Sequence, residues 1–169
     1  VNLLQDDIPG ADKEVILNNS ISLLEYKLAD GIQKIKRQTR QVVAFTSGQG
    51  ELNPLQTASL ENDLSNSYAV NRINLDSIVQ IPSEIKVLII AKPTEEFSEA
   101  HLFMLDQYIM NGGHVMFLID PLIVSLDSIN QNKSYIPPPY NLGLDPLLFK
   151  LGARVNPNLV LDLQCTRIP

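Results

Sequence analysis

Short apolar runs alternate with helical patterns through the middle of the chain, and this alternation constrains the fold more than any other feature. The runs of strand character are QVVAFT, YAVNRINL, KVLIIA and HVMFLID, at 41–46, 68–75, 86–91 and 114–120, and we expect the last two to be buried strands. Helical patterns fill 53–66 and 98–111, where Asn53 and Ser98 are suited to cap the first turns. Strands that alternate with helices form parallel sheets covered on both faces. We therefore predict an α/β fold with a mostly parallel sheet and helices on both faces.

The first forty residues precede this alternation. Residues 1–17 contain the turn residues Pro9 and Gly10 and show no helical period, which predicts an extended N-terminal arm. Apolar residues then recur at steps of three and four from Leu17 to Ile35, which predicts a long helix. We predict one α/β domain over 18–169. Because the chain starts without Met and stops just after a strand-like run, we expect it to be a fragment of a longer protein.

The regularity lapses after Pro121. A long connection over 122–142 contains three consecutive prolines, which favour an extended conformation. Loops of this length inside a domain are usually functional or mobile. If the domain is a scaffold, this loop is its contact surface, and its candidate partner-binding residues are Pro137, Pro138, Pro139 and Tyr140. A short helix from Asp145 to Gly152 and one or two edge strands, ARV and LVLDLQ, are expected to follow.

Charge and composition exclude some classes of function. The formal net charge is -6, so the chain lacks the concentration of Lys and Arg that a nucleic-acid groove requires. A basic cluster at 34–40 is interpreted as cations that offset the negative end of a helix dipole. Cys165 is the single cysteine, so no internal disulfide is possible. The longest apolar runs fall far below the roughly 20 residues needed to cross a bilayer.

Open parallel sheets bind ligands beyond the carboxyl ends of their strands, where the winding direction reverses. If the first two strands pair and the third lies on the other side of the first, segments 46–51 and 92–95 line this crevice together with Asp120 and Pro121. The candidate ligand-binding residues are Ser47, Gly48, Gln49, Gly50, Glu51, Thr94 and Asp120.

The stretch FTSGQGELNPLQ, residues 45–56, has three interpretations. It lacks the full glycine fingerprint of dinucleotide sites and the Gly-Lys-Ser or Gly-Lys-Thr ending of a P-loop, and Glu51 brings negative charge to where a phosphate would lie. The favoured interpretation is a glycine turn into a helix with Asn53 as cap, Pro54 at the first position and Gln56 at the third. Backbone amides that bind a small anion or sugar are the second, and catalysis by Glu51 is the third.

No set of nucleophile, base and orienting group is visible. The turn after VLII offers Thr94 but no thiol and no glycine-flanked elbow. His101 and His114 are expected at opposite edges of the sheet, too far apart for a triad or a zinc site, and His101 is expected to be a partly exposed helix residue. We predict no enzyme activity, no metal and no cofactor.

Several long stretches carry a family resemblance. They are DDIPGADKEVILNNSISLLEYKLADGIQKI, AFTSGQGELNPLQTASLENDLS, VLIIAKPTEEFSEAHLFMLDQYIMNGGHVMFLIDPLIVSLDS and LDPLLFKLGARVNPNLVLDLQC. Together they span nearly the whole chain and resemble the GldG family, the gliding-motility-associated auxiliary components of ABC transporters in Bacteroidetes. That family is described as auxiliary or substrate-binding-like.

The resemblance implies a soluble region on the periplasmic side of the inner membrane, in a membrane-anchored protein whose anchor lies outside this chain. It implies partnership with separate permease and ATPase subunits. The implied fold is flavodoxin-like or glutamine-amidotransferase-like, with Lys92 and Pro93 where an amidotransferase carries its nucleophile. A related domain occurs in an intraflagellar transport protein. We therefore expect a non-catalytic domain that binds a partner subunit or a small ligand; the alternative is a degenerate hydrolase or a sugar-binding domain that uses Glu51 and Asp120.

Overall fold

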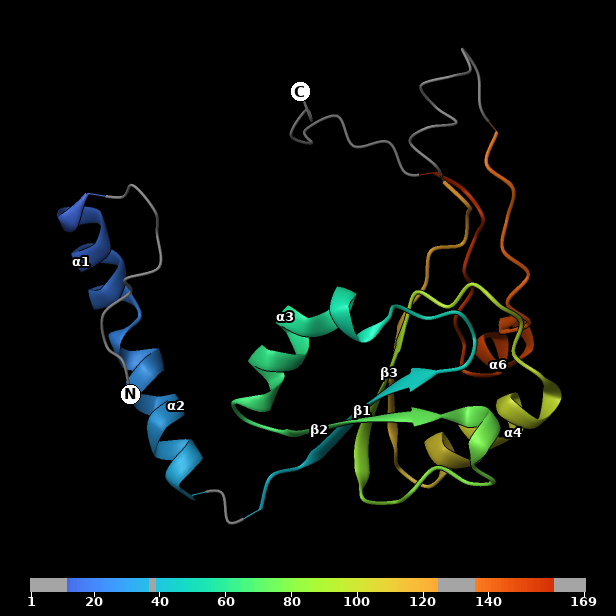
Figure 1. Cartoon of the computed structure of the whole chain (residues 1–169), viewed down its shortest axis with the longest axis horizontal. Helices are drawn as coiled ribbons and strands as arrows, with labels where there is room; N and C mark the ends of the chain where they lie inside the picture. The colour runs from blue at the N-terminus through green and yellow to red at the C-terminus, as the bar shows by residue number, and fades with distance from the viewer. Residues whose placement is uncertain (1–11, 37–38, 125–135, 160–169) are drawn as a thin grey trace. The chain divides into compact units, whose positions relative to one another are not determined.

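The computed structural model describes residues 12–36, 39–124 and 136–159, and the chain forms two compact units, residues 1–40 and 41–169 (Figure 1). In the first unit, α1 (Lys13–Ser22) and α2 (Leu24–Lys36) meet at Leu23. The boundary expected at residues 17 and 18 falls inside α1, so the extended arm is wrong from Lys13 onward. Val15 and Ile16 lie outside the series of apolar residues that begins at Leu17, which is why periodicity did not extend the predicted helix back to Lys13. Residues 1–11 of the predicted arm lie outside the described residues.

The second unit is built on a parallel sheet. Its strands are β1 (Val42–Ser47), β2 (Ala69–Asn74), β3 (Ile85–Ala91) and β4 (His114–Leu118). They lie in the order β2-β1-β3-β4, and each neighbouring pair is parallel. The predicted α/β class is confirmed, and the order matches the first four strands of the flavodoxin-like arrangement.

Helices cover the sheet from both sides, as predicted. α3 (Pro54–Ser65) follows β1, α4 (Glu99–Met110) follows β3, and the 3-10 turn η1 (Leu75–Ser77) follows β2. The predicted capping residues are confirmed: Asn53 accepts from the backbone of α3 while Gln56 reaches back to it, and Ser98 caps α4. α6 (Asp145–Lys150) confirms the predicted short helix.

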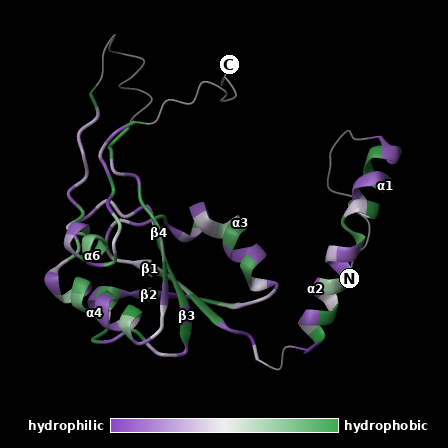
Figure 2. Ribbon diagram, turned by 180° about the vertical axis from the view of Figure 1, so that it is seen from behind, coloured by the Kyte–Doolittle hydropathy of each residue, from purple (hydrophilic) through white to green (hydrophobic). Residues whose placement is uncertain are grey.

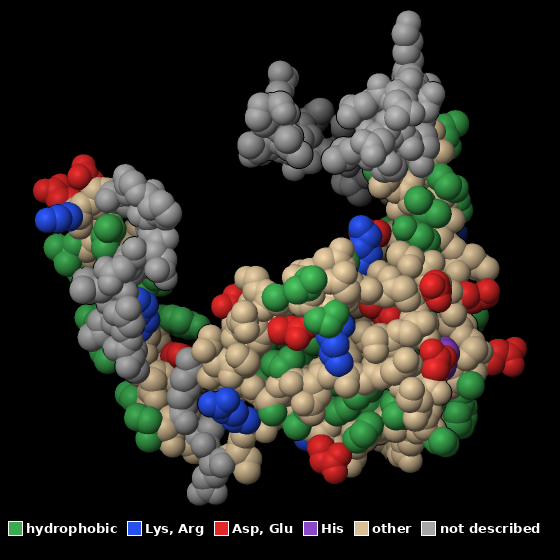
Figure 3. Space-filling model, in the orientation of Figure 1, with side chains coloured by type: hydrophobic (Ala, Val, Ile, Leu, Met, Phe, Trp, Pro, Cys, Tyr) green, Lys and Arg blue, Asp and Glu red, His purple; other side chains and the backbone are tan. Residues whose placement is uncertain are grey.

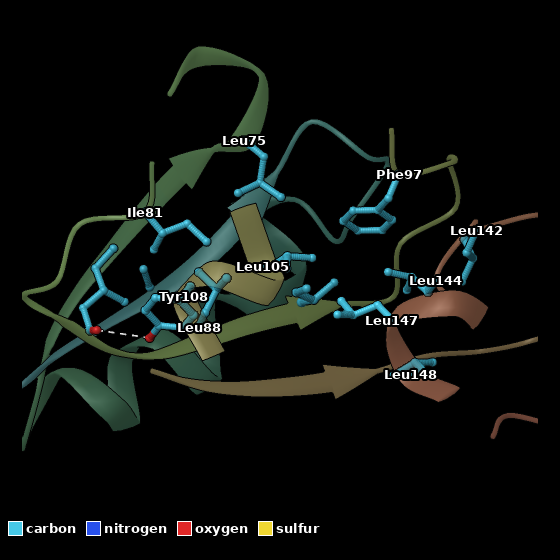
Figure 4. Packing of buried hydrophobic residues seen from close by; sticks show 13 residues of the cluster. Leu75, Ile81, Leu88, Phe97, Leu105, Tyr108, Leu142, Leu144, Leu147 and Leu148 are labelled. Carbon is cyan, nitrogen blue, oxygen red and sulfur yellow. Dashed lines mark hydrogen bonds between the residues drawn. The ribbon is translucent and has the colours of Figure 1, made fainter. Parts of the chain in front are cut away.

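Two hydrophobic clusters form on the two faces of the sheet. Alternate residues of a strand point to opposite faces, so Val43, Phe45, Ile89 and Ala91 pack on the side of α3, with Leu64 and Tyr68 against them. On the other face Ala44, Leu88 and Ile90 meet residues of α4 and α6 (Figure 4). Leu88 and Ile90 are fully buried, and each such side chain contributes about 1.5–3 kcal/mol relative to its exposed state. The Tyr108 hydroxyl donates to the carbonyl of Ile85 at 3.1 Å, the dashed line in Figure 4.

Two expectations on the later strands are wrong. β4 was expected to be buried, but it ends the sheet that the described residues form, and Met116 and Leu118 are 50% and 40% exposed. A parallel strand is buried only where both of its faces and its edge are covered. Residues 153–155, ARV, are irregular rather than a strand. Most of LVLDLQ and the centre of the 122–142 connection lie outside the described residues.

Candidate functional site

The reversal of strand order lies between β1 and β3, and there the loop that contains residues 47–51 meets Thr94. The carbonyl of Gln49 accepts the N–H groups of Thr94 and Glu95 at 2.9 and 3.0 Å. The Thr94 hydroxyl donates to the carbonyl of Gly50 at 3.1 Å, and Leu52 N–H donates to the carbonyl of Ala91 at 3.0 Å. The loop after β1 is therefore tied directly to the loop after β3, and it closes the crevice.

Glu51 turns back into its own loop. Its Oε2 atom accepts the backbone N–H of Gln49 at 2.7 Å. The carboxylate therefore occupies the position that a phosphate bound to this N–H would take. Glu51 Oε1 and Gln49 Oε1 are buried and have no donor among the described residues. Buried acceptors without partners attract a hydrogen-bond donor such as water or a hydroxyl group. The chemistry of this loop therefore disfavours anions.

The two glycines of the loop stand where a side chain does not fit. Gly50 has φ +69, and an added Cβ would lie 2.0 Å from Thr94 Oγ1. At Gly48, with φ +116, an added Cβ would lie 2.7 Å from a carboxylate oxygen of Asp76. Ser47 lies just before them and donates its hydroxyl to the carbonyl of Ile73 at 3.2 Å. These residues serve the close packing of the loop against β2 and the β3–α4 connection.

Asp76 and His101 were missed by the sequence analysis, and both lie beside this loop. His101 is 8% exposed, not partly exposed as expected, and its Nε2 lies 3.0 Å from Asp76 Oδ1. The other carboxylate oxygen of Asp76 accepts from the buried Gln49 amide at 3.4 Å. The available signal was that Asp76 follows the carboxyl end of β2 and therefore lies at the same edge of the sheet.

Ser98, His101 and Asp76 have the residue types of a catalytic triad but a different arrangement. The Nδ1 atom of His101 accepts the backbone N–H of Ser98 at 3.3 Å, and the Ser98 hydroxyl accepts the backbone N–H of His101. Because Nδ1 accepts a hydrogen bond, Nε2 bears the ring hydrogen that points to Asp76 Oδ1, 3.0 Å away. Because both ring nitrogens are engaged, neither is positioned to take a proton from the hydroxyl. The arrangement caps α4 and fixes it to η1.

Asp120 does not join the Glu51 loop by any contact that the structure records; its partner is Lys92. Their charged atoms lie 3.3 Å apart, and the two side chains are 48% and 61% exposed. Lys92 has φ +53, at the turn that follows β3. Hydrolases of α/β type place their nucleophile on a strained strand-to-helix turn of this kind. Here the position holds an amine paired with a carboxylate.

Arg72 on β2 supports the loop from the side of α3. Its guanidinium donates to the carbonyl of Leu52 at 3.1 Å and to Thr57 and Glu61, and it lies 5.4 Å from the centre of the Phe45 ring. The hydrogen bond from the Thr57 hydroxyl, followed by Arg72, lowers the pKa of Glu61 in spite of its partial burial. This cluster is structural, because it joins β2 to the start and middle of α3.

The candidate partner-binding residues lie in a two-stranded ribbon beyond β4, which we define as residues 121–124 and 136–140. Leu122 pairs with Pro139 in antiparallel fashion, and Ile123 N–H and Tyr140 N–H donate to the carbonyls of Pro138 and Pro121. Val124 and Ile136 are 50% and 88% exposed, and Figure 3 shows hydrophobic side chains along this part of the surface.

Two cavities share Pro121 and Tyr140 at the base of this ribbon. One of about 330 Å³ includes Lys92 and Asp120, and one of about 300 Å³ lies toward Leu144 and Val155. The ribbon therefore adds a largely apolar surface to the edge of the sheet where the charged pair Lys92–Asp120 lies.

Metal sites and membrane spans are two further features that would bear on function. Within residues 12–36, 39–124 and 136–159, no three His, Cys, Asp or Glu side chains come together as metal ligands. Over the same ranges, no helix combines the length and the apolar character that a membrane span requires.

The fold and the closed crevice define an α/β domain of the parallel, flavodoxin-like type. Over residues 40–169 the chain matches the family of auxiliary proteins described as "ABC-type uncharacterized transport system", and it belongs to that family. The description of this family links the chain to ABC-type transport systems.

Comparisons with individual proteins add little. No curated protein matches the chain. Among solved structures, the "mmIFT52 N-terminal domain" is similar with 24% identity and a TM-score of 0.39, over 46% of this chain. The match spans 35% of the length of that solved chain.

Proposed function

We propose that this chain is a non-catalytic domain of the GldG type, in an ABC-type transport complex linked to gliding motility. Its role in this proposal is to dock on the permease subunit of the complex and, through it, to associate with the ATPase subunit. The proposal places the domain on the periplasmic side of the inner membrane, held there by an anchor outside this chain. Family membership supports the partnership with transporter components, and the residue stretches quoted above support the gliding-motility type.

The observation that carries the docking role is the contrast between two surfaces. At the crevice, the backbone groups of the loop are already hydrogen-bonded: the Gln49 carbonyl accepts from Thr94, and the Gln49 N–H donates to Glu51. On the ribbon, Ile136 and Val124 are exposed and apolar. Exposed apolar surface rimmed by polar groups is typical of protein interaction sites, and Lys92 and Asp120 supply such groups next to the ribbon.

Co-purification from membranes of the native complex tests this role. Ile136→Asp places a charge on the ribbon at a residue that is 88% exposed, so the fold is expected to persist. We expect this variant to lose most of the co-purifying permease and ATPase subunits. Val79→Asp is the matched control, since Val79 is 94% exposed and lies away from the ribbon. Retention of both subunits by Ile136→Asp contradicts the ribbon as the docking surface.

A hydrolysis assay tests the non-catalytic part of the proposal separately. The purified chain is expected to leave amide and ester substrates unchanged, because Glu51 is held by its own loop and both nitrogens of His101 are engaged. Turnover that disappears in the Glu51→Ala variant would establish an enzyme instead.

A further inference from the structure

An apolar stripe runs along α1 and α2 on the surface of the first unit. Its members recur at steps of three and four, so they share one side of the helical segment. They are all exposed by 39% or more, up to 87% at Ile35, and are Leu17, Ile21, Leu24, Leu28, Ile32 and Ile35. Figure 2 shows hydrophobic positions alternating with hydrophilic ones along both helices. In water, six such side chains on one stripe are unfavourable unless something covers them.

The charged residues of α2 are arranged around this stripe. At about 100° per residue, Lys27 and Lys36 fall on its two borders. Glu25 lies on the same border as Lys36, and Asp30 falls on the opposite side of the helix. Lysines at the border of an apolar face extend their aliphatic stems along it and place the ammonium group in the polar layer above. A helix with one apolar face, bordering lysines and an otherwise polar surface is typical of helices that lie in the plane of a membrane interface.

Net charge separates this segment from the α/β unit. The positive charge lies in α2 and the residues that follow it: residues 24–40 contain five Lys and Arg and two Asp and Glu, a formal charge of +3, whereas residues 1–23 contain one Lys and four Asp and Glu, a formal charge of -3. Residues 41–169 contain seven Lys and Arg and thirteen Asp and Glu, a formal charge of -6. A cationic segment is attracted by an anionic surface, and each Lys or Arg near an anionic bilayer strengthens the attraction.

We propose that α2, together with the stripe residues of α1, lies flat on an anionic lipid surface. The apolar stripe inserts between the headgroups, and Lys27 and Lys36 contact lipid phosphates. The bilayer fits better than a second copy of the chain in a coiled coil. Gly31 stands where the heptad between Leu28 and Ile35 needs an apolar side chain, which weakens the seam of a coiled coil.

Vesicle co-sedimentation of the whole chain 1–169 tests the proposal. We expect binding to vesicles of one part phosphatidylglycerol and three parts phosphatidylcholine, weaker binding to phosphatidylcholine alone, and weaker binding at high salt. The double variant Lys27→Gln, Lys36→Gln is expected to lower partitioning about 25-fold, at about fivefold for each lysine. Ile35→Ser is expected to lower it about tenfold or more. Because Ile35 is 87% exposed, its replacement leaves the fold intact.

Controls in the α/β unit distinguish the helix from the rest of the chain. Val79→Ser and Lys86→Gln remove an exposed apolar group and an exposed charge from that unit, and both are expected to bind vesicles like the unchanged chain. The absence of binding to anionic vesicles, or binding that Ile35→Ser leaves unchanged, overturns the proposal. A dimeric mass in lipid-free buffer that Ile35→Ser reduces to a monomer also overturns it, since a second copy then covers the stripe. The result is independent of the ribbon, so Ile136→Asp is expected to bind vesicles normally.

Discussion

The substitution Gly50→Ala tests whether the loop after β1 is locked against the loop after β3. At φ +69 a non-glycine residue costs about 1 kcal/mol. The added Cβ would lie 2.0 Å from Thr94 Oγ1, so the Thr94 side chain has to move and lose its hydrogen bond to the carbonyl of Gly50. The lost hydrogen bond and the crowding together cost about 2 kcal/mol. We expect Gly50→Ala to lower the free energy of unfolding by about 3 kcal/mol.

Two companion variants separate the contributions. Gly112 has φ +87 and no atom within 4 Å of an added Cβ, so Gly112→Ala reports the backbone cost alone, about 1 kcal/mol. Thr94→Ala removes the hydroxyl that clashes and costs about 1 kcal/mol by itself. In the Thr94→Ala background, Gly50→Ala then meets only carbon atoms at 3.3 Å and is expected to cost about 1 kcal/mol more. The double variant should therefore be about 2 kcal/mol more stable than the sum of the single effects implies.

Urea denaturation followed by far-ultraviolet circular dichroism measures these differences, since the chain contains no tryptophan. The reasoning is refuted if Gly50→Ala costs no more than Gly112→Ala. It is equally refuted if the Gly50 and Thr94 substitutions are additive, because the two loops then do not touch as described.

Three further predictions concern the body of the domain. The pKa of Glu61 is lowered in the folded state, chiefly by the Thr57 hydroxyl and then by Arg72. Its contribution to stability is therefore present above the usual pKa of a glutamate and is lost as pH falls through the lowered value. Glu61→Gln should reduce the fall of the urea midpoint at acidic pH, and an unchanged fall would show that this cluster does not contribute to stability. Burial raises the pKa of Tyr108, so the stability it contributes is present below the usual tyrosine pKa and is lost as pH rises through the raised value. Tyr108→Phe should therefore reduce the alkaline loss of stability while costing about 1 kcal/mol at neutral pH through the hydrogen bond to Ile85, and spectrophotometric titration at alkaline pH checks the direction of the shift. Lys92→Gly relieves a positive φ and should not lower the urea midpoint, whereas Lys92→Ala keeps the strain and should lower it. A lower midpoint in both variants would show that the lysine side chain, through Asp120, outweighs the backbone strain.

The sequence predicted what depends on local pattern. The strands, the caps at Asn53 and Ser98 and the position of the 46–51 turn follow from neighbouring residues, and the parallel topology then places that turn at the crevice. It did not predict contacts between distant segments, such as Asp76 with His101 or Arg72 with Leu52. Burial of a polar side chain depends on the partner that tertiary structure supplies.

Glu51 also shows that local sequence pattern does not predict side-chain contacts, even with residues close in the chain. The argument from its negative charge against a phosphate site stays a prediction, and its position as an open crevice residue was an assumption. Whether a carboxylate faces solvent or accepts its own loop's N–H depends on the backbone path through two positive-φ glycines. That path is fixed by contact with Thr94, forty-three residues after Glu51 in the chain.

The hydrogen bonds across the crevice also set how strongly a ligand could bind there. Entry requires the loop to separate from the β3–α4 connection, which breaks the bonds from Thr94 N–H, Glu95 N–H, the Thr94 hydroxyl and Leu52 N–H. At about 1 kcal/mol for each, opening costs about 4 kcal/mol and weakens any ligand's apparent affinity about a thousandfold. A partner that binds the exposed ribbon incurs no such cost, which is why docking is the better supported role. Hydrogen exchange tests the difference: the amides of Thr94 and Glu95 should be protected about a thousandfold, and exchange at the rate of an unfolded chain would mean that the crevice opens freely and is available to a ligand.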